Sequence, residues 1–213
     1  MLGNYPLLLL PFVAMKRLLD AFYERLWLPL KSALYSILFG IKLGSNVKFK
    51  GKTYIRSCDK RSVEIGDNCT FLSGTANNFV GLMNPTVICA SKGAKIKIGY
   101  RSGFSSVIIH AKSSITIGDY VNVGGNVRIF DHDFHSLDWR DRRPPPNGAG
   151  VRSSPVVIED DVFIGTNAIL LKGTHVGARS IIAAGSVVFG LDIPPDSMVK
   201  GNPARITGRR CNE

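Results

Sequence analysis

One short segment of this 213-residue chain concentrates the residue types that catalyse proton transfer. Asp131, His132, Asp133 and His135 lie within five residues, with Phe134 between the last two. Histidine is the side chain whose ordinary pKa lies nearest to neutral pH, and a neighbouring carboxylate fixes its tautomer and favours the imidazolium that forms. The segment therefore predicts a general base that operates at neutral pH.

Two other interpretations of the same segment must be weighed. Two histidines and two aspartates could bind a divalent metal ion, although five residues that turn a corner would struggle to converge all four side chains, and no further ligands are evident. The plainer alternative is a surface loop whose histidines bond to local groups. Of the three interpretations we favour the general base, and we expect no metal.

The segment interrupts a regular repeat, which must position it. Branched aliphatic residues recur at every sixth position over the stretch that follows it. They are Ile158, Ile164, Leu170, Val176, Ile182 and Val188. A period of six fits neither a helix nor a long strand, so it indicates very short strands joined by regular corners. Three hexads make one triangular turn, and turns stack about 4.8 Å apart. This stacking places Ile158 under Val176, Ile164 under Ile182 and Leu170 under Val188.

The repeat is less regular before the segment. Nineteen residues separate Ile98 from Ile117, where three hexads need eighteen, and His110 falls where an aliphatic residue belongs, so we expect a bulge or a corner insertion there. From Ile129 the next aliphatic of the series is Ile158, which leaves an excursion over residues 130–152. Long loops on rigid scaffolds commonly carry function, and the candidate base lies at the start of this one.

The composition divides the chain near residue 43. Residues 1–43 predict an amphipathic helical segment with a kink at Pro29, and residues 44–213 predict an all-β solenoid with a protruding loop at 130–152. The helix carries leucines on one side, cations, and the aromatic residues Tyr23 and Trp27, which suits peripheral contact with an anionic membrane. It would equally serve to cap the solenoid or to pack in an oligomer.

Charge and targeting signals limit the location and partners. The apolar run from Tyr5 to Met15 is too short to span a bilayer, contains two prolines and has no signal-peptide features, so we expect a cytoplasmic protein, with the helix at the inner face of the membrane where it binds lipid. The net charge is +11, but the cations are scattered over several segments without a nucleic-acid-binding motif, so no nucleic acid is expected. The four cysteines form no CxxC pair, which argues against structural zinc.

Several segments together resemble the hexapeptide-repeat acyltransferases. They are the hexads, Ile158–Gly165 (IEDDVFIG), Ala184–Val188 (AGSVV) and Asp192–Arg205 (DIPPDSMVKGNPAR). The chain is most similar to the galactoside/maltose O-acetyltransferase branch and its relatives in surface-polysaccharide biosynthesis. The resemblance covers about residues 46–210 and leaves out the N-terminal helix.

The resemblance implies a left-handed parallel β-helix that assembles as a homotrimer, with active sites between neighbouring subunits. It implies that acetyl-CoA lies along the groove between two prisms. A loop histidine removes the proton of an acceptor hydroxyl, whose oxygen attacks the thioester directly. The implied acceptor is a sugar or a lipid-linked saccharide.

The resemblance also assigns residues. It favours His135 over His132 as the base, with Asp131, Asp133 or Asp138 as the orienting carboxylate. Further positions match the cofactor contacts: Thr166 and Ala184 for the pantetheine arm, and Arg205 for the CoA phosphates. A lysine usual in the family is missing beside Phe189–Leu191, and we expect Lys200, Arg209 or Arg210 to supply the charge.

Two other function classes stay open. Some hexapeptide β-helices are metal-dependent hydratases of the carbonic-anhydrase type, which need three histidines at the trimer interface. His110, His132 and His135 could be recruited for that role, whereas His175 lies in a regular coil. A solenoid could also serve as a non-catalytic scaffold.

Overall fold

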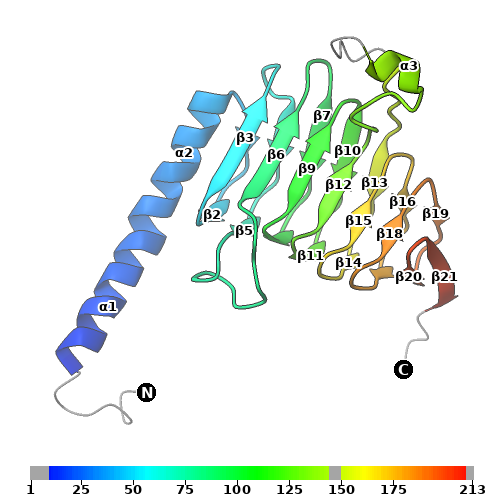
Figure 1. Cartoon of the computed structure of the whole chain (residues 1–213). Helices are drawn as coiled ribbons and strands as arrows, with labels where there is room; N and C mark the ends of the chain where they lie inside the picture. The colour runs from blue at the N-terminus through cyan, green and yellow to red at the C-terminus, as the bar shows by residue number, and fades with distance from the viewer. Residues whose placement is uncertain (1–9, 144–149, 210–213) are drawn as a thin grey trace.

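The computed structural model describes residues 10–143 and 150–209. They form a three-sided prism of short strands with a helix across one end (Figure 1). Each face of the prism is one sheet of parallel strands, and the chain visits the three faces in turn. The coiling is that of a left-handed β-helix, as the resemblance implies.

The three faces are named sheets A, B and C. Sheet A contains β1 (Lys42–Leu43), β4 (Val63–Ile65), β7 (Lys95–Ile98), β10 (Ser114–Ile117), β13 (Val156–Ile158), β16 (His175–Val176) and β19 (Asp192–Ile193). Sheet B contains β2 (Lys48–Lys50), β5 (Thr70–Leu72), β8 (Gly103–Ser105), β11 (Asn122–Gly125), β14 (Phe163–Ile164), β17 (Ile181–Ile182), β20 (Ser197–Gly201) and the antiparallel β21 (Ala204–Arg209). Sheet C contains β3 (Thr53–Ser57), β6 (Thr86–Ala90), β9 (Ile108–Ala111), β12 (Arg128–Phe130), β15 (Ile169–Leu170) and β18 (Val187–Val188).

The core is the predicted stack of inward-facing side chains. Ile158 pairs with Val176, Ile164 with Ile182 and Leu170 with Val188, which confirms the stacking expected from the hexads. All six are at most 1% exposed. In the first coils the inward column of sheet B is aromatic instead. Its members are Phe49, Phe71 and Phe104, whose rings stack 5.0 and 4.7 Å apart.

The corners are held by carboxylates that accept backbone N–H groups of the preceding coil. At the corner between sheets A and B, Asp67 accepts from Ser45 N at 2.6 Å and Asp119 accepts from Tyr100 N at 2.6 Å. Gly99 is needed there because a Cβ atom at that position would lie 2.2 Å from the Asp119 carboxylate. These contacts satisfy donors that a tight corner would otherwise leave unpaired.

The expected irregularity near His110 is confirmed. The register of β8 against β11 shifts between Val123 and Gly125, so the corner before β9 is shorter by one residue. Ile109 therefore points into the core, and His110 lies on the outer surface of sheet C. Ile117 then follows Ile109 by eight residues where six are usual, so the insertion lies at the corner between β9 and β10.

The N-terminal segment is one long helix with an altered middle. It consists of α1 (Leu10–Phe22), a π-helical turn η2 (Tyr23–Trp27) and α2 (Leu28–Phe39). Pro29 lies in the first turn of α2, where a missing N–H costs little. Figure 1 shows the three pieces as one nearly continuous rod. The kink expected at Pro29 is therefore absent, and a π turn precedes Pro29 instead. None of the described helices is long and apolar enough to cross a membrane.

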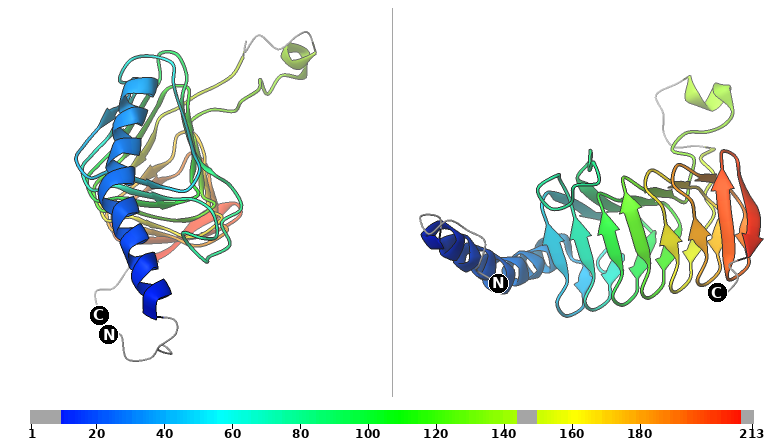
Figure 2. Two further views of the ribbon diagram at one scale, coloured as in Figure 1. Left: turned by 90° about the vertical axis from the view of Figure 1, so that its left-hand side faces the viewer. Right: turned by 90° about the horizontal axis from the view of Figure 1, so that it is seen from below.

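The second half of this rod caps the open end of the prism. Leu28 and Ser32 are buried, and Ser32 Oγ donates to Val47 O at 2.6 Å. Lys31 Nζ donates to the carbonyl oxygens of Phe49 and Gly51 at 2.9 and 2.8 Å. The capping role left open by the sequence is therefore present in α2. Viewed along the prism in Figure 2, α1 extends beyond it.

Candidate active site

The loop segment begins with a buried Asp131–His132 pair at the end of β12. The Asp131 carboxylate accepts the backbone N–H groups of Lys112 and Ser113 at 2.7 and 2.6 Å, the same corner contact that holds the rest of the prism. Its Oδ1 also lies 2.9 Å from His132 Nδ1. Because a carboxylate only accepts, this contact puts the ring proton on Nδ1 and leaves a lone pair on Nε2. His132 Nε2 has no hydrogen-bond partner within residues 10–143 and 150–209.

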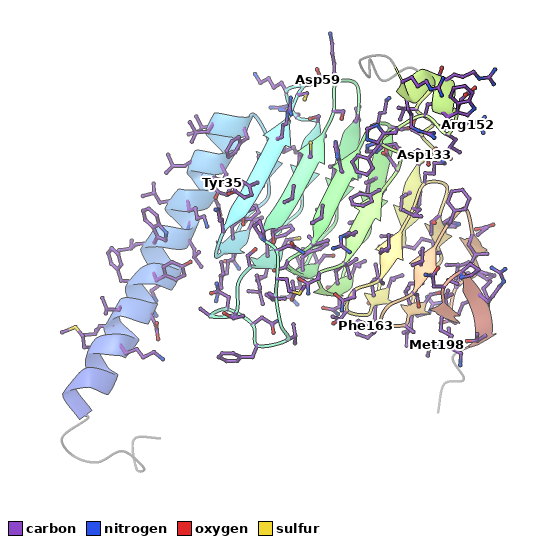
Figure 3. All side chains as sticks on the ribbon, in the orientation of Figure 1. Tyr35, Asp59, Asp133, Arg152, Phe163 and Met198 are labelled. Carbon is purple, nitrogen blue, oxygen red and sulfur yellow. The ribbon has the colours of Figure 1, made fainter. Side chains whose placement is uncertain are left out.

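The two limbs of the loop are tied together where they leave the prism. Ser154 N donates to Asp131 O at 2.9 Å, and Asp133 N donates to Arg152 O at 3.1 Å. An isolated antiparallel bridge joins His132 to Ser153. Figure 3 shows Asp133 and Arg152 side by side at the base of the projecting loop. The His132 ring is therefore fixed to the rigid scaffold, as a positioned base requires.

Aromatic rings surround His132. The rings of Phe134 and His110 lie 4.3 and 4.8 Å from it between centroids. Burial, and then the proximity of His132, hold the pKa of His110 below its ordinary value, so His110 is neutral at pH 7. Of this pair of imidazoles, His132 is the one that contacts a carboxylate, that of Asp131.

The other two candidate orienting carboxylates face elsewhere. Asp133 forms an ion pair with Lys172, whose side chain is 12% exposed, and its Oδ2 is buried without a partner among the described residues. Asp138 accepts from Arg140 N and caps the short helix α3 (Trp139–Arg142). Asp131 is therefore the carboxylate that contacts a histidine of this loop.

His135 lies in a different environment. Its side chain is exposed and forms no hydrogen bond with any described residue, while its backbone N–H donates to Asp133 O at 2.7 Å. Phe134 before it has a φ of 61°, which turns the chain so that the two histidines have unlike surroundings. Part of the predicted loop, residues 144–149, lies outside the described residues.

The predicted pantetheine contacts form a column at another corner. Thr166 and Ala184 follow β14 and β17 in successive turns, at the corner between sheets B and C. At the equivalent place on the corner between sheets A and B, the N–H of Ala178 is taken by Glu159. Neither Thr166 N nor Ala184 N has an acceptor within the described ranges. Two stacked backbone donors are therefore free to bind a carbonyl-bearing chain along this edge.

The predicted phosphate-binding cations lie at the end of this column. Lys200 and Arg205 are cross-strand partners in β20 and β21, and both are exposed. Val199, just before Lys200, accepts the N–H of Ala183, which places the cation pair one turn beyond Ala184. Two adjacent cations next to a row of free donors suit a phosphorylated ligand with an amide-containing arm.

One copy of the chain does not bring the two halves of the predicted site together. Thr166 precedes β15 and His132 follows β12, and these strands are parallel neighbours in sheet C. The base and the cofactor column therefore lie at opposite edges of that sheet. Three cavities, of about 510, 460 and 290 Å³, are lined by none of the predicted site residues.

Comparison with known proteins identifies the repeat. Residues 155–189 match the model of the hexapeptide repeat of succinyl-transferase, over the same stretch where the hexads are most regular. This stretch of the chain is therefore similar to the hexapeptide repeat. A Schizosaccharomyces pombe protein named as an acetyltransferase is 37% identical over 122 residues, which are 57% of this chain and 53% of that protein. The chain thus spans about half the length of this curated relative.

Solved structures share the fold over most of the chain. A hexapeptide-repeat acetyltransferase of Vibrio cholerae O1 biovar eltor, complexed with acetyl coenzyme A, is 29% identical with a TM-score of 0.59, covering 92% of this chain and 85% of that one. Galactoside acetyltransferase in complex with coenzyme A is 19% identical with a TM-score of 0.58, covering 94% and 80%, and supports the fold alone.

The remaining histidine of the chain, His175, belongs to a surface ion-pair ladder on sheet A. His175 Nδ1 lies 2.7 Å from Asp192, and its Nε2 lies 2.9 Å from Glu159. Hydrogen bonds to Asp192 and then Glu159 raise the pKa of His175, and the bond to His175 is the main cause that lowers the pKa of Glu159. His175 is thus occupied with holding three coils together.

This ladder predicts a pH-dependent stability. Folding raises the pKa of His175 above its ordinary value of 6.5. The contribution of His175 to the free energy of unfolding is therefore fully present below pH 6.5 and is lost as the pH rises through the pKa of the folded state. Since the His175 and Glu159 side chains are about 40% exposed and that of Asp192 is 87% exposed, His175→Gln should lower Tm by about 1–3 °C at pH 5.5, and by less at pH 9. Thermal unfolding at both pH values measures this. A difference that stays constant with pH would contradict the assignment.

Proposed function

We propose that the chain transfers an acetyl group from acetyl-CoA to a hydroxyl group of a saccharide, with His132 as the general base. The observation that carries this proposal is the Asp131–His132 pair, which is buried, tied to the prism and oriented with Nε2 free. The 29% identity to an acetyltransferase complexed with acetyl coenzyme A supports the donor.

The residues present would act in the following order. His132 Nε2 takes the proton of the acceptor hydroxyl as its oxygen bonds to the carbonyl carbon of the acetyl group, and Asp131 stabilises the imidazolium that forms. Acetyl-CoA supplies the acetyl group on a thioester, whose C–S bond breaks. His132 then returns its proton to the departing sulfur, which leaves the histidine ready for another turnover. Direct transfer of this kind needs no acyl-enzyme.

The corner between sheets B and C fits the donor substrate. The free N–H groups of Thr166 and Ala184 would donate to the amide carbonyl groups of the pantetheine arm, and Lys200 with Arg205 would bind the phosphates. A larger side chain at Ala184 would stand in this path, because Ala184 is exposed on the corner. The residues present therefore fit an extended, phosphorylated thioester.

A complete site then requires two copies of the chain. Since His132 and Thr166 lie at opposite edges of sheet C, the loop of one copy would reach the cofactor column of the next. Closed cyclic assemblies satisfy such a head-to-tail contact for every subunit. We propose a homotrimer as the assembly, in line with the resemblance set out above.

A hydroxyl acceptor makes use of the base. A saccharide hydroxyl keeps its proton at neutral pH and needs a base during attack, whereas a neutral amine can attack without one. The buried pair is therefore better explained by O-transfer than by N-transfer. Parallel acceptor panels of saccharides and of amino sugars would separate the two.

The test of this function is release of CoA thiol from acetyl-CoA in the presence of a saccharide panel. Wild-type protein should release thiol only when an acceptor is present. Lys200→Glu combined with Arg205→Glu should raise KM for acetyl-CoA at least tenfold with little change in kcat, because each lost charge-assisted bond is worth about 1.5–3 kcal/mol. Lys95→Glu with Lys97→Glu, on the exposed face of sheet A, makes the same charge change away from the site and serves as the control.

Other outcomes would support other functions. Stoichiometric zinc with CO₂ hydration and no thiol release would favour the hydratase. Absence of thiol release, of bound zinc and of hydration would favour the scaffold. An equal effect of both charge-reversed pairs on KM would contradict the assignment of Lys200 and Arg205.

A further inference from the structure

The helix that caps the prism also carries a continuous apolar surface on its outer side. Its large side chains there are 42–78% exposed. They are Met15, Leu18, Leu19, Phe22, Leu26, Leu30, Leu34, Ile37 and Leu38, and together they are called the outer stripe. It spans 24 residues, or about 36 Å of helix. An exposed apolar surface of this size marks an interaction site.

The π turn keeps the outer stripe on one side of the helix. From Phe22 to Leu34 the stripe advances by four residues three times, and each such step would drift about 40° around an α-helix. The π turn at Tyr23–Trp27 lies within this interval and lengthens the turn, which compensates for the drift. Leu28 and Ser32 meanwhile remain buried against the prism on the other side. The same device therefore serves both surfaces of the helix.

The positive charge of the protein is concentrated at this end. Residues 1–61 contain eleven Lys and Arg against three Asp and Glu, a net charge of +8 out of the chain's +11. Lys16 and Arg25 are exposed on the helix itself. Copies of such an end repel each other, whereas an anionic surface attracts it. The charge therefore favours an anionic lipid surface over a second copy of the chain as the occupant of the outer stripe.

We infer that α1, η2 and α2 lie along the headgroup region of an anionic bilayer, with the outer stripe in contact with the acyl chains. Trp27, 46% exposed beside the stripe, is of the type that prefers this interface. The helix lies on the bilayer without spanning it, because exposed cations interrupt its apolar surface and the apolar side chains lie on one side. Because α1 extends beyond the prism, it can lie flat while α2 stays docked (Figures 1 and 2).

This surface would hold the prism with its N-terminal end toward the membrane. The loop with His132 follows β12, three strands along sheet C from β3. The site would then stand about 14 Å along the prism from the first strand of that sheet. It would face a saccharide that is carried near the bilayer, independently of which group the site transfers.

Vesicle binding tests this inference through Trp27. The chain has two tryptophans, so a Trp139→Phe background makes the emission specific for Trp27. Phosphatidylcholine vesicles with an equal part of phosphatidylglycerol should shift the emission to the blue and sediment with the protein, and pure phosphatidylcholine should bind less. Replacing Leu19, Phe22 and Leu26 with Gln should weaken binding at least tenfold. The matched control, Phe79→Gln, Met83→Gln and Leu137→Gln, removes three apolar side chains elsewhere that are even more exposed, and it should bind as the parent does.

Each outcome bears on the inference. Lys16→Glu with Arg25→Glu should remove most of the preference for anionic vesicles, since both cations lie exposed on the helix that would contact the headgroups. Absence of binding by the parent protein would overturn the inference, as would equal binding by the glutamine variant. If the glutamine variant instead changed the mass in sedimentation while the parent ignored vesicles, the outer stripe would be an interface between copies. Circular dichroism should show that the variants keep the fold, because the substituted side chains are exposed.

Discussion

Replacing His132 with alanine should lower kcat of acetyl transfer by about 10²- to 10⁴-fold, the usual contribution of a positioned general base. The reason is geometric: Asp131 orients the ring through Nδ1 at 2.9 Å, and the paired limbs of the loop fix it to the prism. His135→Ala should keep most of the activity, because the exposed His135 side chain has no orienting carboxylate among the described residues. Steady-state kinetics with saturating acetyl-CoA measure both variants.

Because the His132 side chain is only 5% exposed, its loss also affects packing. His132→Asn, which keeps a group able to donate to Asp131, should preserve more of the thermal stability than alanine while losing the same activity. Near wild-type turnover by His132→Ala together with a large loss in His135→Ala would reverse the assignment. That result would return the base to His135, the residue favoured by the resemblance.

The fold could be predicted because the sequence pattern that specifies it is local and repeats along the chain. One branched aliphatic at every sixth residue specifies a strand, a corner and a place in the stack, so the pairing of Ile158 with Val176 follows from counting. The position of His110 shows what cannot be predicted by counting hexads. The sequence indicated an irregularity between Ile98 and Ile117, but the shorter corner before β9 became visible only in the register.

The loop has no repeating sequence pattern, so its contacts could not be predicted in the same way. The sequence offered three carboxylates to orient a histidine, and the choice of Asp131 depends on the N–H groups of Lys112 and Ser113, nineteen and eighteen residues earlier. The ion pair of Asp133 with Lys172 was missed. A signal existed, since Leu170 stacks on Ile129 and this register brings Lys172 beside the start of the loop.

The separation of the base from the cofactor column leads to the other large expected effect, complementation between inactive chains. His132→Ala removes the base and leaves the column intact, whereas Ala184→Trp obstructs the column and leaves the base intact. Each variant alone should be nearly inactive. Co-expressed in equal amounts, they should recover roughly a quarter of wild-type activity, because random assembly of a ring pairs an intact base with an intact neighbouring column at one contact in four. Thiol release per subunit from the purified mixed assembly measures the recovery.

A matched mixture makes the test independent of how well the variants assemble. When the chain that carries both substitutions is co-expressed with wild type, sites within single subunits would retain half of the activity, since half of the chains are intact. Sites shared between subunits would retain about a quarter, because both neighbours must then be wild type. Two results would together place His132 opposite the Thr166–Ala184 column of the next subunit. They are recovery of activity in the first mixture and retention of about a quarter of wild-type activity in the second. Failure of the first mixture, with half retained in the second, would instead require the loop to fold back over its own prism, across the full width of sheet C.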